Sequence, residues 1–368
     1  MKVLQILPEM NAGGVERGTL EIGRHLVQQG CEALVVSNSG RMVAELESVG
    51  VRHVAMPVHR KSPGSLFQTG PLRRLLEAEQ PDILHIRSRV PGWIAWLAWR
   101  KMNPQTRPRL ITTVHGFYSV NAYSTVMTKG ERVIAVSESI RDYITANYPR
   151  TSGESIRVIP RGIEPANYPR GFRPDPTWLK PWQNDFPQLT GKRVLTLPGR
   201  ITRLKGHEDF MRLVAALLNA GEPVHGLIVG DVHPKKREYL EGLRALADQL
   251  KLAAHITLTG HRADLREILS VSDVVYSLST QPEAFGRTTL EALALGRPVV
   301  AYDHGGVSEQ LHQFFPEGCV PLGDAGRLLQ VTRSVLCNSF APRPVGEPFT
   351  LDAMCRATLD VYRELVPG

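Results

Sequence analysis

Cysteine and long apolar runs are both scarce in this chain of 368 residues. The four cysteines, Cys31, Cys319, Cys337 and Cys355, include no C-x-x-C pair and no nearby histidine at metal-ligand spacing, so neither a disulfide scaffold nor a zinc module is expected. No stretch approaches the ~20 apolar residues of a membrane-spanning helix. The apolar run in residues 1–8 is shorter than a signal-peptide core and predicts a first strand. We therefore expect a cytoplasmic protein with reduced thiols that is not integral to a membrane.

Three motifs of metal and nucleotide chemistry are also missing. The thirteen aspartates form no Asp-x-Asp triplet, so no carboxylate metal site is predicted. There is no G-x-x-x-x-G-K-[ST] loop and no G-x-G-x-x-G fingerprint, because the glycines from Gly13 to Gly18 have the wrong spacing. Kinase and dehydrogenase functions therefore lose their main support.

What the chain does contain is an alternation of short apolar runs and helix-period segments. In the first half these are Val3–Leu7, Val15–Gln29, Ala33–Val36, Val51–Met56, Ile83–Ile86, Gly92–Lys101, Leu110–Val114, Val133–Val136 and Glu138–Asn147. The strand-like runs of the second half are Arg193–Leu197, Val224–Val229, His255–Leu258, Val274–Leu278 and Pro298–Ala301, with helices between them. Strand-then-helix repetition is typical of parallel βαβ units. The sequence predicts an α/β protein with parallel sheets.

A proline-dense stretch separates the two halves. Six prolines fall between Glu164 and Pro187, a density that we expect neither a helix nor a central strand to tolerate. Since a single core stops growing near ~250–300 residues, two domains are expected. We predict an N-terminal domain over 1–164 and a C-terminal domain over 165–349 that begins with this linker. A final helix within 350–368 is predicted to cross back to the N-terminal domain.

The excess positive charge is confined to the first half. Residues 1–185 carry 24 Lys and Arg against 16 Asp and Glu, whereas residues 186–368 carry 20 of each. Such asymmetry favours a first domain that meets an anionic surface or ligand. A solvated basic face without a partner remains the alternative.

The most informative segment runs from Gln281 to Ala301. It follows an apolar strand, breaks at Pro282 and opens a helix near Gly286, so free backbone N–H groups at the carboxyl edge of a sheet form a ready phosphate site. Glu283 precedes the helix and Glu291 lies in its second turn, so both carboxylates can accept hydrogen bonds from a hydroxyl-rich ligand. The alternative for Glu291 is that it caps or solvates an ordinary helix.

A second basic segment, Gly199–Arg–Ile–Thr–Arg–Leu–Lys–Gly206, also follows a strand. Arg200 and Lys205 are candidates for the fixed positive charge that a diphosphate needs. Two basic residues in a loop are a weak indication by themselves. The indication is stronger because the segment from Gln281 to Ala301 also follows a strand.

Together these segments resemble the large family 4 of retaining glycosyltransferases, which have two facing Rossmann-like domains in the GT-B fold. The resemblance runs the length of the chain, and the E-x7-E pair formed by Glu283 and Glu291 is its specific part. The other matching segments are Asn11–Ala–Gly–Gly–Val–Glu–Arg17, Thr113–Val–His–Gly116, the Arg200/Lys205 loop, and Gly305–Gly306 with Glu309. The implied activity is metal-independent transfer of a sugar from a nucleotide-sugar donor, with UDP favoured, to a glycan or lipid-linked acceptor. Lipopolysaccharide-core or related cell-envelope synthesis is the implied setting.

The resemblance also implies a role for each matching residue. The implied catalytic residues are His115, beside the transferred sugar, Arg200 and Lys205 on the diphosphate, and Glu283 on the donor sugar. The implied donor-binding residues are Gly13, Gly14, Gly199, His261, Arg262, Ala284, Phe285, Gly286, Arg287, Thr288 and Glu291. Gly13 and Gly14 would let the N-terminal domain close over the phosphates. No cofactor is implied, since the nucleotide sugar is a substrate, and the leaving phosphate itself would take the acceptor's proton.

The stretch from His85 to Arg89 is less standard for that family. It follows a strand, so Arg87 and Arg89, with Tyr118, are candidate contacts for an anionic acceptor. Trp93, Trp96 and Trp99 follow at a spacing of three. Such a face is more often core than membrane contact, although peripheral contact with the cytoplasmic face of an inner membrane is the alternative.

Two other functions stay open at this stage. A nucleotide-sugar epimerase shares the two-domain fold and would act on the donor alone. A non-enzymatic sugar-nucleotide sensor is the second alternative, but a sensor gives no reason for both glutamates. No nucleic-acid partner is expected.

Overall fold

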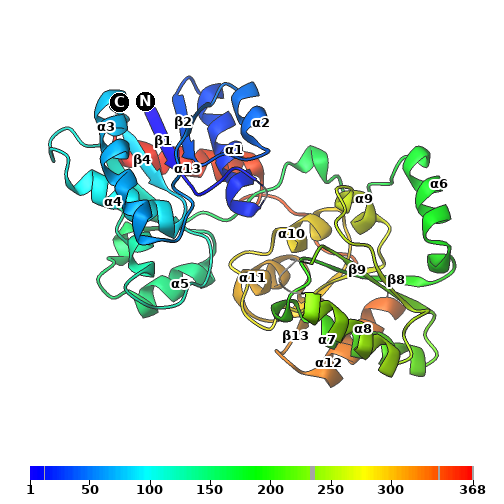
Figure 1. Cartoon of the computed structure of the whole chain (residues 1–368). Coiled ribbons are helices and arrows are strands. Elements are labelled where there is room, and N and C mark those ends of the chain that lie inside the picture. The colour runs from blue at the N-terminus through cyan, green and yellow to red at the C-terminus, as the bar shows by residue number, and fades with distance from the viewer. Residues whose placement is uncertain (12, 233–236, 339, 367–368) are drawn as a thin grey trace. The chain divides into compact units, whose positions relative to one another are not determined.

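The computed structural model describes residues 1–11, 13–232, 237–338 and 340–366. The chain forms two compact units (Figure 1): unit 1 is Met1–Gly162 with Pro348–Gly368, and unit 2 is Ile163–Glu347. The domain boundaries that we predicted, at 164–165 and 349–350, lie two residues from these.

Unit 1 is built on a parallel sheet of seven strands in the order β3-β2-β1-β4-β5-β6-β7. Its strands are β1 (Lys2–Ile6), β2 (Glu32–Ser37), β3 (Arg52–Ala55), β4 (Ile83–Ile86), β5 (Arg109–Val114), β6 (Arg132–Ala135) and β7 (Ile156–Val158). Its helices are α1 (Gly14–Gln28), α2 (Val43–Ser48), α3 (Thr69–Glu79), α4 (Arg89–Arg100), α5 (Glu138–Asn147) and α13 (Leu351–Leu365), with short 3₁₀ turns η1 (Pro63–Gln68), η2 (Ser124–Thr128) and η3 (Gly153–Ser155). Helical crossovers are required because consecutive parallel strands run in one direction. The strand order reverses beside β1, so the loops after β1 and β4 diverge there.

The last helix, α13, belongs to unit 1, as its sequence led us to expect (Figure 1). Met354, Leu359 and Tyr362 are buried in one core cluster with residues of β1 and α1. The Tyr362 hydroxyl bonds His85 Nδ1 at 2.7 Å. At the surface, Glu364 accepts hydrogen bonds from Arg132 and Arg157. The helix is thus an integral part of the N-terminal core.

Unit 2 repeats the architecture with a parallel sheet of six strands in the order β10-β9-β8-β11-β12-β13. Its strands are β8 (Arg193–Pro198), β9 (Val224–Val229), β10 (Ile256–Leu258), β11 (Val274–Ser277), β12 (Val299–Tyr302) and β13 (Cys319–Val320). Its helices are α6 (Pro176–Asp185), α7 (His207–Asn219), α8 (Arg237–Gln249), α9 (Leu265–Ser270), α10 (Arg287–Ala294), α11 (Gly305–Phe314) and α12 (Ala325–Cys337), with 3₁₀ turns η4 (Pro165–Asn167), η5 (Pro187–Leu189), η6 (Arg203–Lys205) and η8 (Pro316–Gly318). The two parallel sheets confirm the predicted α/β class.

The proline-dense stretch contains a helix, so the expectation of none was wrong. Asp175 caps α6 by accepting from the Thr177 amide at 2.8 Å, and Pro176 occupies the first helical position, where no N–H is needed. Trp178 and Trp182 stack with ring centroids 5.1 Å apart, and Trp182 is buried. Burial of this aromatic face outweighs the hydrogen bond that Pro181 removes from inside the helix.

The three tryptophans of α4 are half-buried and do not form the core. Trp93 donates to the Tyr123 carbonyl and Trp99 to the Pro108 carbonyl, each at 2.7 Å. Arg100 and Lys129 lie over the Trp96 ring at 4.5 and 4.6 Å. The outer surface of α4 is therefore aromatic and cationic together.

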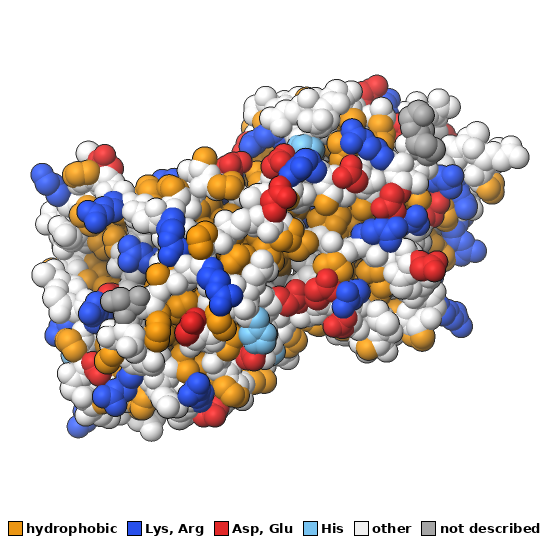
Figure 2. Space-filling model, turned by 180° about the vertical axis from the view of Figure 1, so that it is seen from behind, with side chains coloured by type: hydrophobic (Ala, Val, Ile, Leu, Met, Phe, Trp, Pro, Cys, Tyr) orange, Lys and Arg blue, Asp and Glu red, His pale blue; other side chains and the backbone are white. Residues whose placement is uncertain are grey.

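The charge asymmetry between the two halves of the sequence persists when charges are counted in each unit. Unit 1 carries 23 Lys and Arg against 16 Asp and Glu, net +7, and unit 2 carries 21 against 20, net +1. On the face that Figure 2 shows, lysine and arginine are interspersed with aspartate and glutamate and form no single basic patch. Several basic residues of unit 1 are paired, including Arg52 with Glu79 and Arg109 with Glu131.

All four cysteines are free. Across the described residues, no helix has the length and apolar character needed to span a membrane.

Candidate active site

Unit 2 has a pocket of about 580 Å³ at the carboxyl edge of its sheet. The pocket is lined by Arg200, Thr202, Leu204, Lys205, Asp231, Val232, Ser279, Gln281, Pro282 and Glu283. These residues follow β8, β9 and β11, and β8 lies between the other two strands. Loops diverge at such a point of strand reversal, and ligands of open α/β sheets bind there.

The centre of the pocket is an ion pair between two predicted catalytic residues. Lys205 Nζ donates to Glu283 Oε1 at 2.7 Å, with 29% and 24% of the two side chains exposed. Burial raises the pKa of Glu283, but Lys205 and the hydroxyls of Ser279 and Ser277 outweigh it and hold that pKa below its ordinary value. Glu283 is therefore a carboxylate at neutral pH and can only accept hydrogen bonds. It is suited to holding a hydroxyl group and not to donating a proton.

A glycine keeps the Lys205 turn close to β11. Gly206 has φ +70°, and a Cβ there would lie 2.0 Å from the Leu278 carbonyl oxygen, so only glycine lets the Lys205 turn approach β11. The Thr280 amide donates to the Leu204 carbonyl at 2.9 Å across the same junction. Arg200 lies on the exposed side of this pocket and forms no ion pair within the described part of the chain.

The second glutamate lies in α10, which starts beside the pocket. Gly286 caps the helix at φ +87°, where a Cβ would meet Val307 Cγ2 at 2.4 Å. The amides of Arg287 and Thr288 belong to the first turn of the helix. Glu291 is 8% exposed in the second turn. Glu283 thus lies four residues before the first residue of α10, and Glu291 lies within that helix.

The loop from Glu283 to Gly286 packs against α11 and accepts hydrogen bonds from it. The Gly306 amide donates to the Glu283 carbonyl at 2.8 Å, and Gln310 Nε2 donates to the Phe285 carbonyl. A Cβ at Gly306 would lie 2.6 Å from the Ala284 carbonyl oxygen. The Gly305–Gly306 pair noted in the sequence therefore acts by allowing this close packing.

Two predicted donor residues lie outside the lining of the pocket. Arg262 forms an ion pair with Asp264 at 2.6 Å and lies over the Trp182 ring at 5.5 Å. His261 is exposed beside it. Both follow β10, the strand at the edge of the sheet, so the strand order separates them from the loop of β11.

In unit 1, the predicted residue His115 follows β5 in a buried basic cluster. Arg161 Nη2 donates to His115 Nδ1 at 2.5 Å. A guanidinium only donates, so Nδ1 is unprotonated and the neutral ring carries its proton on Nε2. Burial, followed by Arg161 and Arg87, holds the pKa of His115 well below its usual value. Nε2 is buried without a hydrogen-bond partner in the described chain.

The predicted acceptor residues differ in position. Arg87 is 1% exposed and donates to Gln5 Oε1 at 3.0 Å, and its Nε and Nη2 have no partner among the described residues. Arg87 is therefore fully buried and does not form an open wall of the site. Arg89 is half-buried and lies 4.5 Å over the ring of Tyr118, whose hydroxyl accepts from the His115 amide at 3.2 Å. Arg89, Tyr118 and His115 are therefore contiguous.

The glycine-rich segment begins α1 on unit 1. Gly13 caps the helix and Gly14 is its first residue. A Cβ at Gly18 would lie 3.1 Å from Arg87 Nη2 and 3.2 Å from Arg161 Nη1, so the absence of a side chain there leaves room for two guanidinium groups.

Two residues of the unit 2 pocket and one residue of the unit 1 cluster were not singled out from the sequence. Asp231 and Ser279 each follow a strand of unit 2, and that position was the available signal. Arg161 follows β7 and gave no signal, since its partner His115 lies 46 residues earlier.

One group of possible metal ligands occurs among the described residues: Asp303, His312 and Cys319 lie within 4.8 Å of one another. His312 Nε2 is 3.1 Å from Asp303 Oδ1. Burial, with Asp303 and Glu317, raises the pKa of Cys319 to about 12, which disfavours the thiolate that a metal requires. None of the three lines the pocket of unit 2.

The paired Rossmann-like sheets and the basic pocket at a strand reversal define a glycosyltransferase of the GT-B fold. Residues 12–167 match the family model described as Glycosyltransferase Family 4, and residues 180–338 match the one described as Glycosyl transferases group 1. The chain belongs to glycosyltransferase family 4, whose members are retaining enzymes that use nucleotide-sugar donors.

Two curated relatives illustrate the likeness. The chain is 27% identical over 305 residues to an alpha-maltose-1-phosphate synthase of Mycolicibacterium smegmatis, covering 76% of each chain. It is 26% identical over 342 residues to a D-inositol 3-phosphate glycosyltransferase of Stackebrandtia nassauensis, covering 81% of this chain and 73% of that one.

Solved structures share the fold over the whole chain. A glycosyltransferase of Rickettsia africae ESF-5 is 26% identical with a TM-score of 0.83, covering 100% of this chain and 99% of that one. Anabaena Alr3699/HepE in complex with UDP-glucose is 18% identical with a TM-score of 0.75, covering 100% and 98%. The lipopolysaccharide outer core galactosyltransferase WaaB is 15% identical with a TM-score of 0.68, covering 100% and 98%.

Proposed function

We propose that this glycosyltransferase transfers a sugar from a UDP-sugar to an anionic glycan or lipid-linked acceptor of the bacterial cell envelope, such as a lipopolysaccharide precursor, on the cytoplasmic side of the membrane. The observation that carries the donor half is the pocket of unit 2, where Lys205 and Arg200 supply positive charge at the point of strand reversal. The Anabaena protein of the same fold was solved with UDP-glucose, which supports UDP as the nucleotide.

In this proposal each donor residue performs one task. Lys205, held by Glu283 at 2.7 Å, and Arg200 stabilise the negative charge that grows on the departing diphosphate. The α10 amides at Arg287 and Thr288 bind its β-phosphate. Glu291 accepts hydrogen bonds from the ribose, and Glu283 accepts one from the sugar. Because Lys205 and Glu283 hold each other in place before the donor arrives, these two groups need little reorganisation during reaction.

The acceptor half rests on unit 1. Its net charge of +7 and the cluster of His115, Arg87 and Arg161 favour an anionic acceptor. The names of the relatives agree in this respect, since inositol 3-phosphate and maltose 1-phosphate are both phosphate esters. The neutral His115 donates through Nε2 to an oxygen of the transferred sugar. The acceptor's proton passes to the leaving phosphate oxygen, so that the C–O bond to the acceptor forms as the bond to the diphosphate breaks on the same face.

Thermal-shift measurements with UDP-, GDP- and ADP-sugars test the donor assignment. A ligand at 100 times its dissociation constant adds ~2.7 kcal/mol to stability, so UDP-sugars are expected to give the largest rise in melting temperature. A larger rise with another base contradicts UDP. Loss of turnover in EDTA that Mg²⁺ restores contradicts phosphate stabilisation by Lys205 and Arg200 alone. Conversion of the donor sugar in the absence of any acceptor indicates the epimerase alternative.

A further inference from the structure

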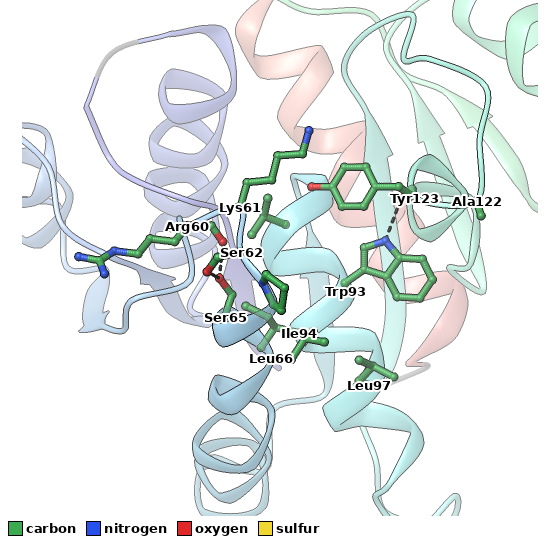
Figure 3. A pocket seen from close by; sticks show the side chains of 12 residues that line it. Arg60, Lys61, Ser62, Ser65, Leu66, Trp93, Ile94, Leu97, Ala122 and Tyr123 are labelled. Atoms are coloured by element: carbon green, nitrogen blue, oxygen red, sulfur yellow. Dashed lines mark hydrogen bonds between the residues drawn. The ribbon is translucent and has the colours of Figure 1, made fainter.

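Besides the pocket of unit 2, the protein has a pocket of about 610 Å³ in unit 1, which the proposed donor chemistry does not use (Figure 3). It lies among η1, the first turns of α4 and the segment at 122–123, and its lining includes Leu66, Trp93, Ile94 and Leu97. Among the described residues, no carboxylate lines it. Its volume is within the ~300–1,000 Å³ of small-molecule sites, and a mostly apolar lining favours an apolar ligand group.

The rim of this pocket is cationic. Figure 3 shows the Lys61 side chain reaching toward the Tyr123 ring, and its Nζ lies 5.3 Å from the centre of that ring. The Arg89 guanidinium lies 5.4 Å from the same ring and donates to Ser124 Oγ at 3.3 Å. Within the described residues, neither Lys61 nor Arg89 forms an ion pair, although other basic residues of unit 1 do. Two cations at one edge of an apolar pocket are complementary to an anionic group attached to an apolar chain.

The same edge leads to the predicted catalytic histidine. Arg89 also lies 4.5 Å from the centre of the Tyr118 ring, and the Tyr118 hydroxyl accepts from the His115 amide. Unit 1 therefore presents an apolar pocket, then two cations, then His115, in that order. A lipid-linked acceptor has the same order: a hydrocarbon tail, a phosphate and a hydroxyl group that receives the sugar.

Exposed apolar side chains also occur in or next to two of the segments that line this pocket. Among the described residues of unit 1, three large apolar side chains stand out as exposed: Leu66 at 46%, Phe67 at 84% and Val120 at 55%. Leu66 and Phe67 belong to η1, and Val120 precedes the segment with Ala122 and Tyr123, so both segments are walls of the pocket. Exposed apolar residues grouped at one place mark a contact surface.

We propose that this pocket binds the hydrocarbon tail of a lipid-phosphate acceptor, while Lys61 and Arg89 bind the phosphate and direct the acceptor hydroxyl toward His115. This proposal rests on the proposed function and gives the acceptor its chemical class. The Leu66 and Trp93 side chains contact the tail.

Binding of monoalkyl phosphates to the full-length chain, measured by calorimetry below their micelle concentrations, tests the proposal without turnover. Each methylene buried in the pocket is expected to raise the affinity roughly three- to fourfold until the pocket is filled. The alcohol of the same chain length is expected to bind at least about tenfold more weakly, because it lacks the charge that Lys61 and Arg89 recognise. An affinity that does not depend on chain length, or alcohols that bind as tightly as phosphates, overturns the proposal.

A matched pair of variants separates the pocket from a general apolar surface. Leu66→Glu puts a carboxylate in the lining and is expected to lower alkyl phosphate affinity by about tenfold or more, whereas Phe67→Glu, at an exposed neighbouring position outside the lining, is expected to change it less than twofold. Equal losses in the two variants indicate contact of η1 with a bilayer and no tail site. Should Leu66→Glu fail to fold, Leu97→Trp fills the pocket instead and is expected to abolish the dependence on chain length.

Vesicle binding and the thermal shift with UDP-sugars distinguish the remaining outcomes. If anionic vesicles bind the chain and alkyl phosphates do not, the surface meets a bilayer and the tail site is wrong. The donor function is read separately from the thermal shift with UDP-sugars. A chain that binds UDP-sugar but no alkyl phosphate loses the tail site alone, and a chain that binds alkyl phosphate but no nucleotide sugar loses the proposed function.

Discussion

The two units share one architecture and differ in how their charges are arranged. Each has a parallel sheet whose order reverses at a central strand, with polar side chains on the loops that follow. In unit 2 the central cation, Lys205, is already paired with Glu283. In unit 1 the cations Arg87 and Arg161 surround a neutral histidine, and Arg87 keeps two unpartnered donor atoms among the described residues.

This difference has a physical consequence for binding. A pocket whose central cation is already paired is partly organised before the ligand arrives, which suits a ligand of fixed chemistry such as a nucleotide diphosphate. A buried cation with unpaired donors gains most from an anion, because such donors are costly while they lack a partner. We therefore expect a preformed donor site in unit 2 and, in unit 1, a site whose binding depends on the charge of its ligand.

The largest expected effect concerns the paired cation of unit 2. Lys205→Ala is expected to lower kcat by about 10²–10³-fold, since removal of one donor that stabilises transition-state charge has that cost. Arg203→Ala is the control, because Arg203 is on the same turn but lies over the Tyr239 ring and outside the pocket lining. Steady-state kinetics that show equal losses in both variants would assign the effect to the fold of the turn.

The second prediction addresses the ribose contact. Glu291→Gln is expected to weaken UDP binding by about 10–150-fold, the equivalent of ~1.5–3 kcal/mol for a hydrogen bond to a charged group. Calorimetric titration with UDP measures it, and Glu241→Gln in α8, whose partner Arg244 is exposed, is the matched control. Wild-type affinity in Glu291→Gln would remove this residue from the donor site.

The third prediction asks whether the units respond alike to acid. Burial is the main cause that lowers the pKa of His85 and His115 in unit 1, and it lowers those of His207 and His225 in unit 2 to about 4. Unfolded histidine titrates near ~6.5, so below that pH the unfolded chain binds protons that the native chain does not. Stability therefore falls as the pH drops from about 7 to 5.5, by roughly 1 kcal/mol for each histidine.

Calorimetric melting at several pH values measures this loss. Both units are expected to lose stability in the same direction, and above about pH 7.5 the histidines should have no effect. His225→Gln is expected to flatten the slope for unit 2 alone. Rising stability between pH 7 and 5.5 would contradict the prediction.

The smallest expected effect is at the end of the chain. Glu364→Gln removes the carboxylate that Arg132 and Arg157 share at the surface of unit 1, and a surface ion pair contributes only ~0–1 kcal/mol. Chemical denaturation is expected to show a change of that size. A larger loss would mean that these ion pairs, and not the burial of Met354 and Tyr362, hold α13 on unit 1.

Much of the architecture could be predicted from local patterns. Strand and helix periods placed β9 and α5 at their observed bounds, because side chains alternate along a strand and recur every 3.6 residues in a helix. The failure at α6 has an equally local cause: proline density outweighed the spacing of Trp178 and Trp182, whose stacking stabilises the helix. For α4, the helix itself was predicted correctly, but the tryptophan face that we expected in the core is half-buried.

The sequence by itself determined the positions of the glycines and the E-x7-E spacing, which puts Glu283 just before α10 and Glu291 in its second turn. Both features depend only on residues that are close together along the chain. Only the tertiary structure decided which loops meet. Lys205 reaches Glu283 across 78 residues, Arg161 reaches His115 across 46, and Tyr362 reaches His85 across 277. The physical reason is that strand order, which the periodicity of one segment does not contain, brings the carboxyl ends of distant strands to the same edge of a sheet.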